Sequence, residues 1–300
     1  MIKWIALRSE GPVFASTMQT LKKLETNLVP NKDTGDGPEY YEAGPGSLAI
    51  YTCSSPDKDK PNEDRIAIIP YGNNSLILMI ADGAGGHASG DTASATAIKL
   101  ICKSIMKTDH ENSELREAIL AGIETANTEL MNSAPGSATT ISLAEIHRDT
   151  VRTYHAGDTE IIVTGLKGKL KYQTLIHSPV GYAVEAGLLD EADAIMHEDR
   201  HIVSNVLGFS DMHITIGSPF RLDTYDTLLI ATDGLFDNLQ KDEILELIRK
   251  GPLKDCANNL VAMTSERMFE KDREKPSKID DLSFILFRPK RATERRNTQQ

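Results

Sequence analysis

Short acidic motifs placed beside hydrophobic runs of strand length are the feature that most constrains this chain. There are four of them: Asn62-Glu63-Asp64, Asp82-Gly83, Asp233-Gly234 and Asp280-Asp281. Apolar runs lead directly into Asp82 and Asp233, and another follows Asp281. A fold that brings these strand ends together gathers carboxylates, which repel one another unless cations lie between them. Hard oxygen ligands favour Mg²⁺ or Mn²⁺ over zinc, so the pattern predicts a two-metal enzyme.

Composition and charge exclude several classes of protein. The formal net charge is −11, from 33 basic and 44 acidic residues, which argues against nucleic-acid binding. No apolar stretch approaches the roughly 20 residues that span a bilayer. The cysteines Cys53, Cys102 and Cys256 form no CxxC pair, which indicates free thiols in a reducing compartment. We therefore expect a cytoplasmic protein, without membrane or nucleic-acid partners, that is a monomer.

The chain divides into three parts by composition. Residues 1–44 read as an N-terminal extension and linker, with a short helix at 18–28 and a loop rich in Gly and Pro at 31–46. Residues 45–289 form the expected catalytic domain. Residues 290–300 form a polar tail that we expect to be disordered.

Strand and helix signals within the central part occur in blocks. Strand-like segments are 48–53, 65–70, 76–80, 139–146, 151–156, 160–164, 169–175, 213–218, 227–232 and 282–287. Helical spacing covers 88–106, 113–131, 242–249 and 252–269, and 178–212 looks irregular with short helical pieces. Without regular alternation, a doubly wound parallel sheet is disfavoured. The order predicts an α+β fold, a four-layer α-β-β-α sandwich of two antiparallel sheets flanked by helix pairs.

Each acidic motif also has a plain structural interpretation. The glycines after Asp82 are compatible with a simple turn into a helix. Asp233 is compatible with a helix cap or an Asx turn, and the other two motifs with solvated loops. Four weak signals that share one topology favour a common site.

Six segments carry a resemblance to a known family. They are NED at 62–64, DGAGGH at 82–87, GSATT at 136–140, AGDTE at 156–160, TDGLFD at 232–237 and DDLSF at 280–284. In this order and spacing they resemble the metal-dependent type-2C serine/threonine protein phosphatases of the bacterial branch. The resemblance covers roughly residues 47–288, and the family's fold is the four-layer sandwich that the element order predicts.

The resemblance implies two ions, Mn²⁺ or Mg²⁺, as cofactors. Asp82 would bridge them. The Gly83 carbonyl and Glu63 would bind one ion, and Asp233 and Asp280 would bind the other.

Further residues follow from the same resemblance. Asp158 and Asp237 would share a third, weaker ion with Asp233. Asp64 is assigned a catalytic part, in which it orients metal-bound waters. Asp281 falls where the family usually has Asn and is expected to support the site without binding metal.

The implied reaction needs no protein nucleophile. Two cations lower the pKa of a bound water and neutralise the transferring phosphoryl group, and the water then attacks phosphorus in line. This agrees with the lack of a GxSxG motif or a Cys-based phosphatase loop.

Two departures from the family concern substrate chemistry. Many members carry a phosphate-binding arginine where this chain has Asp59, so we predict that Lys58 or Lys60 contacts phosphate in its place. Ala84 stands where other members have a histidine that can act as a general acid, and His87 nearby is expected to be structural. The segment 178–187, with Asp199-Arg200-His201, is the candidate for substrate contact.

These observations predict hydrolysis of phosphoserine and phosphothreonine on proteins, the substrates of a serine/threonine kinase. One alternative is a phosphatase of the same fold that acts on small phosphorylated metabolites. The other is a non-catalytic module that binds phosphoproteins, which the missing arginine favours and the intact acidic set disfavours.

Overall fold

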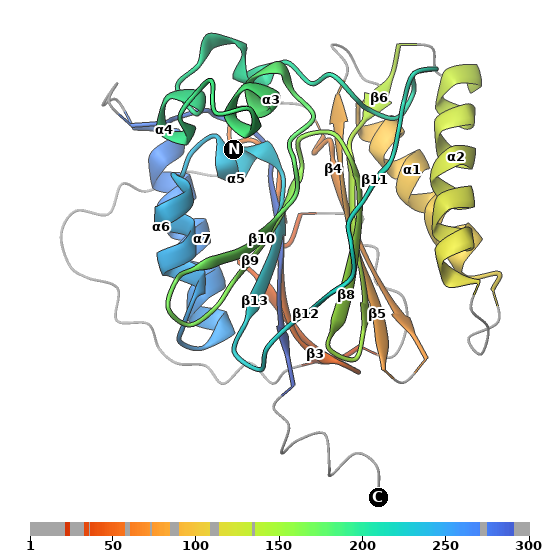
Figure 1. Cartoon of the computed structure of the whole chain (residues 1–300), viewed down its shortest axis with the longest axis horizontal. Coiled ribbons are helices and arrows are strands. Elements are labelled where there is room, and N and C mark those ends of the chain that lie inside the picture. The colour runs from red at the N-terminus through yellow and green to blue at the C-terminus, as the bar shows by residue number, and fades with distance from the viewer. Residues whose placement is uncertain are drawn as a thin grey trace, which may run out of the picture.

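Two sheets stacked face to face between helices form a four-layer sandwich (Figure 1). The computed structural model describes residues 22–24, 33–35, 37–57, 61–72, 74–84, 90–108, 114–133, 136–270 and 275–290. The expected fold class is confirmed, and the strand pairs of the described residues are antiparallel apart from β1 with β2.

Each sheet has seven strands. The first runs in the order β1 (Lys22–Lys23), β2 (Glu39–Ala43), β3 (Gly46–Cys53), β14 (Leu282–Pro289), β13 (Thr227–Ala231), β9 (Glu160–Thr164) and β10 (Leu170–Gln173). The second runs in the order β11 (Thr215–Ile216), β8 (Thr150–Ala156), β7 (Ile141–His147), β5 (Ser75–Ala84) and β4 (Asp64–Tyr71), while β12 (Phe220–Arg221) pairs with β8 and β6 (Ala138–Thr139) pairs with β5.

Helices cover the outer faces of both sheets. The second sheet is covered by α1 (Gly90–Ile105) and α2 (Leu115–Ser133), and the first by α6 (Lys241–Ile248) and α7 (Leu253–Met268). A smaller group, which we call the flap, contains α3 (Pro179–Glu185), α4 (Glu191–Ala194) and the 3-10 helix η1 (Glu198–His201). One further short helix, α5 (Asp233–Phe236), follows β13 directly.

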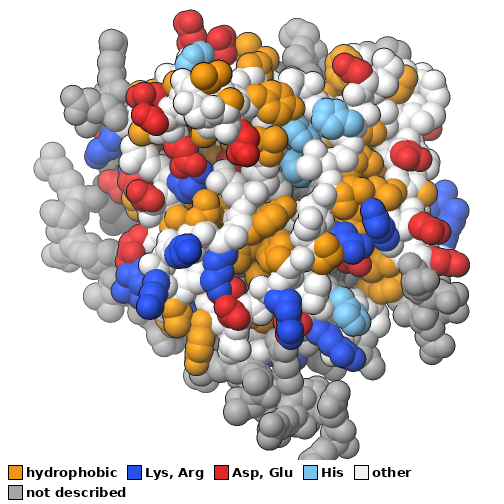
Figure 2. Space-filling view, in the orientation of Figure 1, with side chains coloured by type: hydrophobic (Ala, Val, Ile, Leu, Met, Phe, Trp, Pro, Cys, Tyr) orange, Lys and Arg blue, Asp and Glu red, His pale blue; other side chains and the backbone are white. Residues whose placement is uncertain are grey.

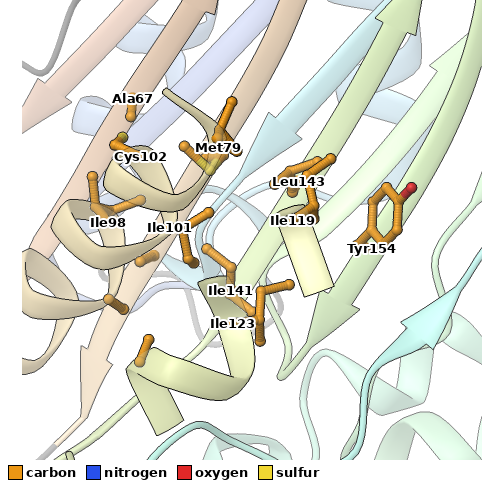
Figure 3. Packing of buried hydrophobic residues seen from close by; sticks show 14 of the residues in the cluster. Ala67, Met79, Ile98, Ile101, Cys102, Ile119, Ile123, Ile141, Leu143 and Tyr154 are labelled. Carbon is orange, nitrogen blue, oxygen red and sulfur yellow. The ribbon is translucent and has the colours of Figure 1, made fainter. Parts of the chain in front are cut away.

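Strand alternation explains why both faces of the central strands are buried. In β5, Ile77 and Met79 point to the helices α1 and α2, whereas Leu78 and Ile80 point to the opposite sheet. Helix spacing completes the outer core, where Ile98 and other apolar residues of α1 and α2 pack on β5 and β7 (Figure 3). Continuous apolar runs are typical of such doubly covered strands.

Three expectations for local structure were wrong. Lys22–Lys23 is a strand beside β2 and not part of a helix, although most of 18–28 lies outside the described residues. The loop expected at 31–46 contains β2, which extends the first sheet by pairing with β3. Strand β5 does not end at Asp82 but continues to Ala84, because Gly83 and Ala84 pair with β6. The domain boundaries stay a prediction.

Candidate active site

The ends of β4 and β5 place two aspartates opposite each other. Asp64 and Asp82 are partners in the antiparallel register, so their side chains lie on one face. The Asp82 N–H donates to Thr140 Oγ1 over 3.0 Å, and the Asp82 carbonyl accepts from the Thr140 N–H over 2.8 Å. Asp82 is therefore fixed by main-chain contacts on both sides.

Two glycines bring the Gly83 carbonyl beside Glu63. A Cβ atom on Gly90 would lie 2.4 Å from Glu63 Oε1 and 2.7 Å from the Gly83 carbonyl oxygen. A Cβ atom on Gly83 would lie 2.0 Å from the Gly90 carbonyl oxygen. Neither position accepts a larger residue without a backbone shift, and the close packing sets the two oxygens next to one another.

A third glycine brings Asp233 to the start of β14. A Cβ atom on Gly234 would lie 1.8 Å from the Asp281 carbonyl oxygen, so only glycine lets α5 begin this close to β14. The neighbouring Thr232 links the sheets, since its hydroxyl donates to Asp64 Oδ2 over 3.0 Å and its N–H donates to the Ser283 carbonyl over 3.1 Å.

Asp281 supports the site through the main chain. Its two carboxylate oxygens accept the N–H groups of Ser55, over 2.7 Å, and Glu63, over 2.8 Å. An Asn side chain offers a single oxygen for this purpose, which gives a physical reason for Asp at this position. Asp281 thereby holds the segment that carries Glu63.

Six aspartates from these segments form what we call the acidic cluster: Asp64, Asp82, Asp158, Asp233, Asp237 and Asp280. Burial is the largest cause that raises the pKa of Asp82, and the neighbouring charges, Asp64 first among them, raise it further. Burial and neighbouring charges also raise the pKa of Asp158 to about 7 and that of Asp233 to about 6. Carboxylates that resist ionisation in this way are stabilised by cations.

The ammonium of Lys278 lies inside the acidic cluster. It is paired with Asp233 Oδ2 and lies 3.0 Å from Asp237 Oδ2 and 3.0 Å from Asp280 Oδ2. Among the described residues, no group of three or more His, Cys, Asp or Glu side chains is arranged to hold a metal ion. The lysine shows that this end of the cluster accepts a positive charge.

The donor set fits hard divalent cations. The carboxylates, the Gly83 carbonyl and Glu63 all offer oxygen ligands, as Mg²⁺ and Mn²⁺ prefer. The roles of Glu63, Gly83 and the acidic cluster as metal ligands stay a prediction, with the geometry of the strand ends in its favour.

Several predicted residues lie outside the part of the chain that the structure describes. Lys58, Asp59 and Lys60 fall in one such gap and His87 in another, so their predicted roles remain predictions. Arg65 faces main-chain carbonyls, since it donates to those of Asn62 and Asp64.

A pocket of about 480 Å³ lies between the flap and α5, next to the acidic cluster. Asp158, Asp233 and Asp237 form one end of it. Its apolar lining includes Val180, Val184, Ile195 and Phe236, and its charged lining includes Glu185, Glu191, Arg200 and Asp242. Figure 2 shows acidic side chains crowded over α3 and α4, while basic ones gather lower on the same face. The pocket contains part of the segment predicted to contact substrate.

A second polar group adjoins the acidic cluster. We call His155, His177 and His213 the histidine cluster, in which the His177 ring lies 4.5 Å from that of His155 and 5.2 Å from that of His213. His177 Nδ1 accepts the Gly157 N–H over 3.2 Å, so the cluster touches the residue before Asp158. Burial lowers the pKa of His177 to about 4, and the charges of the other two histidines add to this shift.

Sequence reasoning missed Lys278, Asn238 and Glu160. Lys278 stands two residues before Asp280, and a basic residue so close to an acidic pair was the available signal. Glu160 is buried beside the pocket, where burial raises its pKa to about 7 and Gln173 Nε2 donates to it over 2.8 Å. No local pattern distinguishes Asn238, whose contacts are made 40 residues away.

Comparisons with known proteins find protein phosphatases. A family model described as protein phosphatase 2C matches residues 54–267, a segment that ends before Asp280. A serine/threonine phosphatase, Stp of Listeria monocytogenes, is 28% identical over 198 residues, which are 63% of this chain and 77% of that protein.

Solved structures extend the likeness to the whole sandwich. The serine/threonine phosphatase of S. agalactiae has a TM-score of 0.70 and 25% identity, covering 81% of this chain and 99% of that one. The catalytic domain of the phosphatase PstP, solved with two manganese ions, has a TM-score of 0.65 at 20% identity and covers 81% of this chain and 98% of that one. Since the family model spans more than half of its residues, the chain belongs to the protein phosphatase 2C family.

Proposed function

We propose that this chain removes phosphate from phosphoserine and phosphothreonine on proteins, with Mn²⁺ or Mg²⁺ held at the acidic cluster. The observation that carries the proposal is the convergence of carboxylates from the ends of β4, β5, β13 and β14 on one point. The phosphatases that this chain resembles act on serine and threonine phosphate by name, and PstP was solved with two manganese ions.

The proposed ligands belong to two ion positions. Asp82 would bridge both, with the Gly83 carbonyl and Glu63 on one side and Asp233 and Asp280 on the other. When bound, the ions would supply an acidic water and neutralise charge on the phosphoryl group.

The chain's own contribution is to fix these ligands. Thr140 holds the Asp82 main chain, and Asp281 holds that of Glu63. Asp64, which accepts the Thr232 hydroxyl, would orient water beside the ions. Asp158 and Asp237, which the resemblance assigns with Asp233 to a third and weaker ion, belong to the same cluster, and the Lys278 ammonium lies beside Asp233 and Asp237.

The pocket beside the acidic cluster supports a protein substrate. Its apolar side chains offer contact to residues next to the phosphorylated one, and its volume of about 480 Å³ exceeds what a phosphate alone would fill. Substrates of a serine/threonine kinase fit this chemistry.

The three cysteines have free thiols, which fits the proposed cytoplasmic location, and we propose a monomer. No helix in the described part of the chain is long and apolar enough to cross a membrane.

Turnover of a phosphothreonine peptide, compared with p-nitrophenyl phosphate and free phosphoserine, tests the proposal. We expect hydrolysis that chelator abolishes and Mn²⁺ restores, with kcat/KM for the peptide about tenfold or more above both small substrates. Preference for free phosphoserine would favour the metabolite phosphatase. Peptide binding without turnover would favour the non-catalytic module.

A pair of flap variants tests whether the pocket itself binds substrate, as distinct from a general effect of changing the flap. Val184→Asp places a charge in the pocket, whereas Leu188→Asp changes a side chain that is 82% exposed on the same flap. Only Val184→Asp should raise KM for the peptide, with little change for p-nitrophenyl phosphate. Equal effects of both variants on both substrates would remove the pocket from substrate binding.

A further inference from the structure

The Lys278 side chain is held in the acidic cluster from two directions. Its ammonium contacts three carboxylates, those of Asp233, Asp237 and Asp280. The side chain is only 26% exposed, so these contacts are largely shielded from solvent. Lys278 is also near enough to Asp158 to oppose the rise in that residue's pKa.

The main chain of Lys278 is fixed by Asn238. The Lys278 N–H donates to Asn238 Oδ1 over 2.9 Å, and Asn238 Nδ2 donates to the Lys278 carbonyl over 2.8 Å. The same Nδ2 donates to the Gly234 carbonyl over 2.9 Å, and the Asn238 side chain is fully buried. This double contact locks Lys278 to the helix that carries Asp233, so the ammonium is part of the site's construction.

We propose that Lys278 is a tethered cation that takes the place of a third metal ion at Asp233 and Asp237, beside Asp158. The inference rests on the proposed metal site. A tethered group acts at an effective concentration in the millimolar range, so it competes well with a weakly bound ion that is present at a lower concentration. The ammonium pairs with Oδ2 of Asp233, and a carboxylate has a second oxygen with which it can bind a catalytic ion at the same time.

The consequence is a two-ion enzyme at ordinary metal concentrations. The outer carboxylates are already neutralised in part by Lys278, and by Arg200, whose Nε lies 3.4 Å from Asp237 Oδ1. Replacing the ammonium with a neutral side chain should open this position to a metal ion.

Manganese binding, measured without substrate, tests the proposal. Equilibrium dialysis with elemental analysis, and calorimetric titration, would compare wild type with Lys278→Met, Lys278→Gln, Lys278→Arg and Lys275→Met. Lys275 lies on the same segment, is 50% exposed and pairs with Glu270, so its variant matches the change in charge away from the site.

We expect wild type, Lys278→Arg and Lys275→Met to bind two ions. Lys278→Met and Lys278→Gln should bind a third, or bind their weakest ion about tenfold tighter, as expected when one charge is removed about 4 Å from an ion. Anomalous scattering from crystals soaked in Mn²⁺ should place that ion between Asp158, Asp233 and Asp237.

Melting in chelator provides a second readout. Both neutral variants at Lys278 should lose more thermal stability than Lys275→Met, and Mn²⁺ should restore it. Unchanged ion number and affinity in both neutral variants would overturn the proposal, as would a loss of ions. A raised KM for phosphopeptide with unchanged metal binding would also overturn it, since Lys278 would then serve the substrate phosphate. If none of the five proteins binds Mn²⁺, the proposed function itself fails, and this inference with it.

Discussion

The acidic cluster and the histidine cluster adjoin at Gly157, and burial acts on the two in opposite directions. It raises the pKa of Asp64, Asp82, Asp158 and Asp233, with Asp158 moved to about 7, and lowers the pKa of His155 and His177, with His177 moved to about 4. In both cases the neutral form is favoured.

The two clusters also differ in the hydrogen bonds and ion pairs that their side chains make. Asn205 joins the histidine cluster together, since its Nδ2 lies 2.8 Å from both His177 Nδ1 and the His213 carbonyl. The His155 Nε2 lies 2.8 Å from the Leu175 carbonyl, whereas His155 Nδ1 is buried without a hydrogen-bond partner among the described residues. In the acidic cluster, Lys278 and Arg200 are the cations among the described residues that pair with the aspartates. The difference indicates that the histidine cluster is built for structure and the acidic cluster for cations from solution.

Removing charge at the centre of the acidic cluster should have the largest effect. For Asp82→Asn or Asp233→Asn we expect turnover with Mn²⁺ to fall by about 10³-fold or more, because a neutral amide is a poor ligand for the ions that activate water. Melting in chelator should show equal or greater stability, because repulsion is relieved. Asp211→Asn, at an exposed position, is the control. Near wild-type turnover in either variant would exclude the site.

The next largest effect should come from the lysines that are predicted to contact the substrate phosphate. We predict that Lys58→Ala, Lys60→Ala or the double variant raises KM for a phosphopeptide by about tenfold with little change in kcat, because an ammonium binds phosphate without orienting it. The converse variant, Asp59→Arg, should lower KM. If all three alanine variants keep wild-type kinetics, phosphate is held by the metals or by another cation.

The fold was largely predictable because buried strands carry a strong signal. The run before Asp82 is apolar on both faces, and the structure buries both faces of β5. Errors arose where pairing with a distant segment decides the structure. Strand β2 lies in a polar stretch and is held by β3, and the end of β5 is extended by β6. Such pairing overrides local propensity.

The site was predictable only in its acidic half. Aspartates beside glycine at strand ends stand out in a sequence, and the glycines at 83 and 234 do make the close approaches that bring them together. Lys278 does not stand out, because its place depends on Asn238, which lies 40 residues away. A lysine in a short polar segment is ordinarily solvated, so its closeness to Asp280 and Asp281 was too weak a signal to single it out.

Without metal, the acidic cluster should make stability fall as pH rises. The unfolded pKa of Asp is about 3.9. The folded values are about 6 for Asp233 and about 7 for Asp158, so between these limits the folded state binds more protons. The free energy of unfolding therefore decreases with rising pH in this window. Because the histidines act oppositely below about 6.5, the range from 6.5 to 8 is the one to measure.

Melting in chelator across that range checks this sign. Wild type should lose a few degrees, about what 1 kcal/mol costs a domain of this size. This decrease in melting temperature should be smaller in Asp158→Asn and the same as in wild type in Asp211→Asn. Addition of Mn²⁺ should abolish it. A wild-type melting temperature that rises with pH in chelator would contradict the raised pKa values.

The smallest effect should come from the histidine cluster. In His177→Gln the contacts of Nδ1 with Gly157 and Asn205 are lost, and we expect a melting temperature about 2–4 °C lower at pH 7.5. Wild type should lose stability as pH falls from about 6.5 toward 4, because the unfolded His177 binds a proton that the folded one does not, and the variant should lose less. His147→Gln, at an exposed position, is the control. Turnover per folded chain should stay within about threefold of wild type. The His177 ring bonds Gly157, Asn205 and Thr215, which are not among the six aspartates. A fall in turnover as large as that of Asp82→Asn would show that His177 takes part in the reaction. The distinction between the two clusters would then no longer hold.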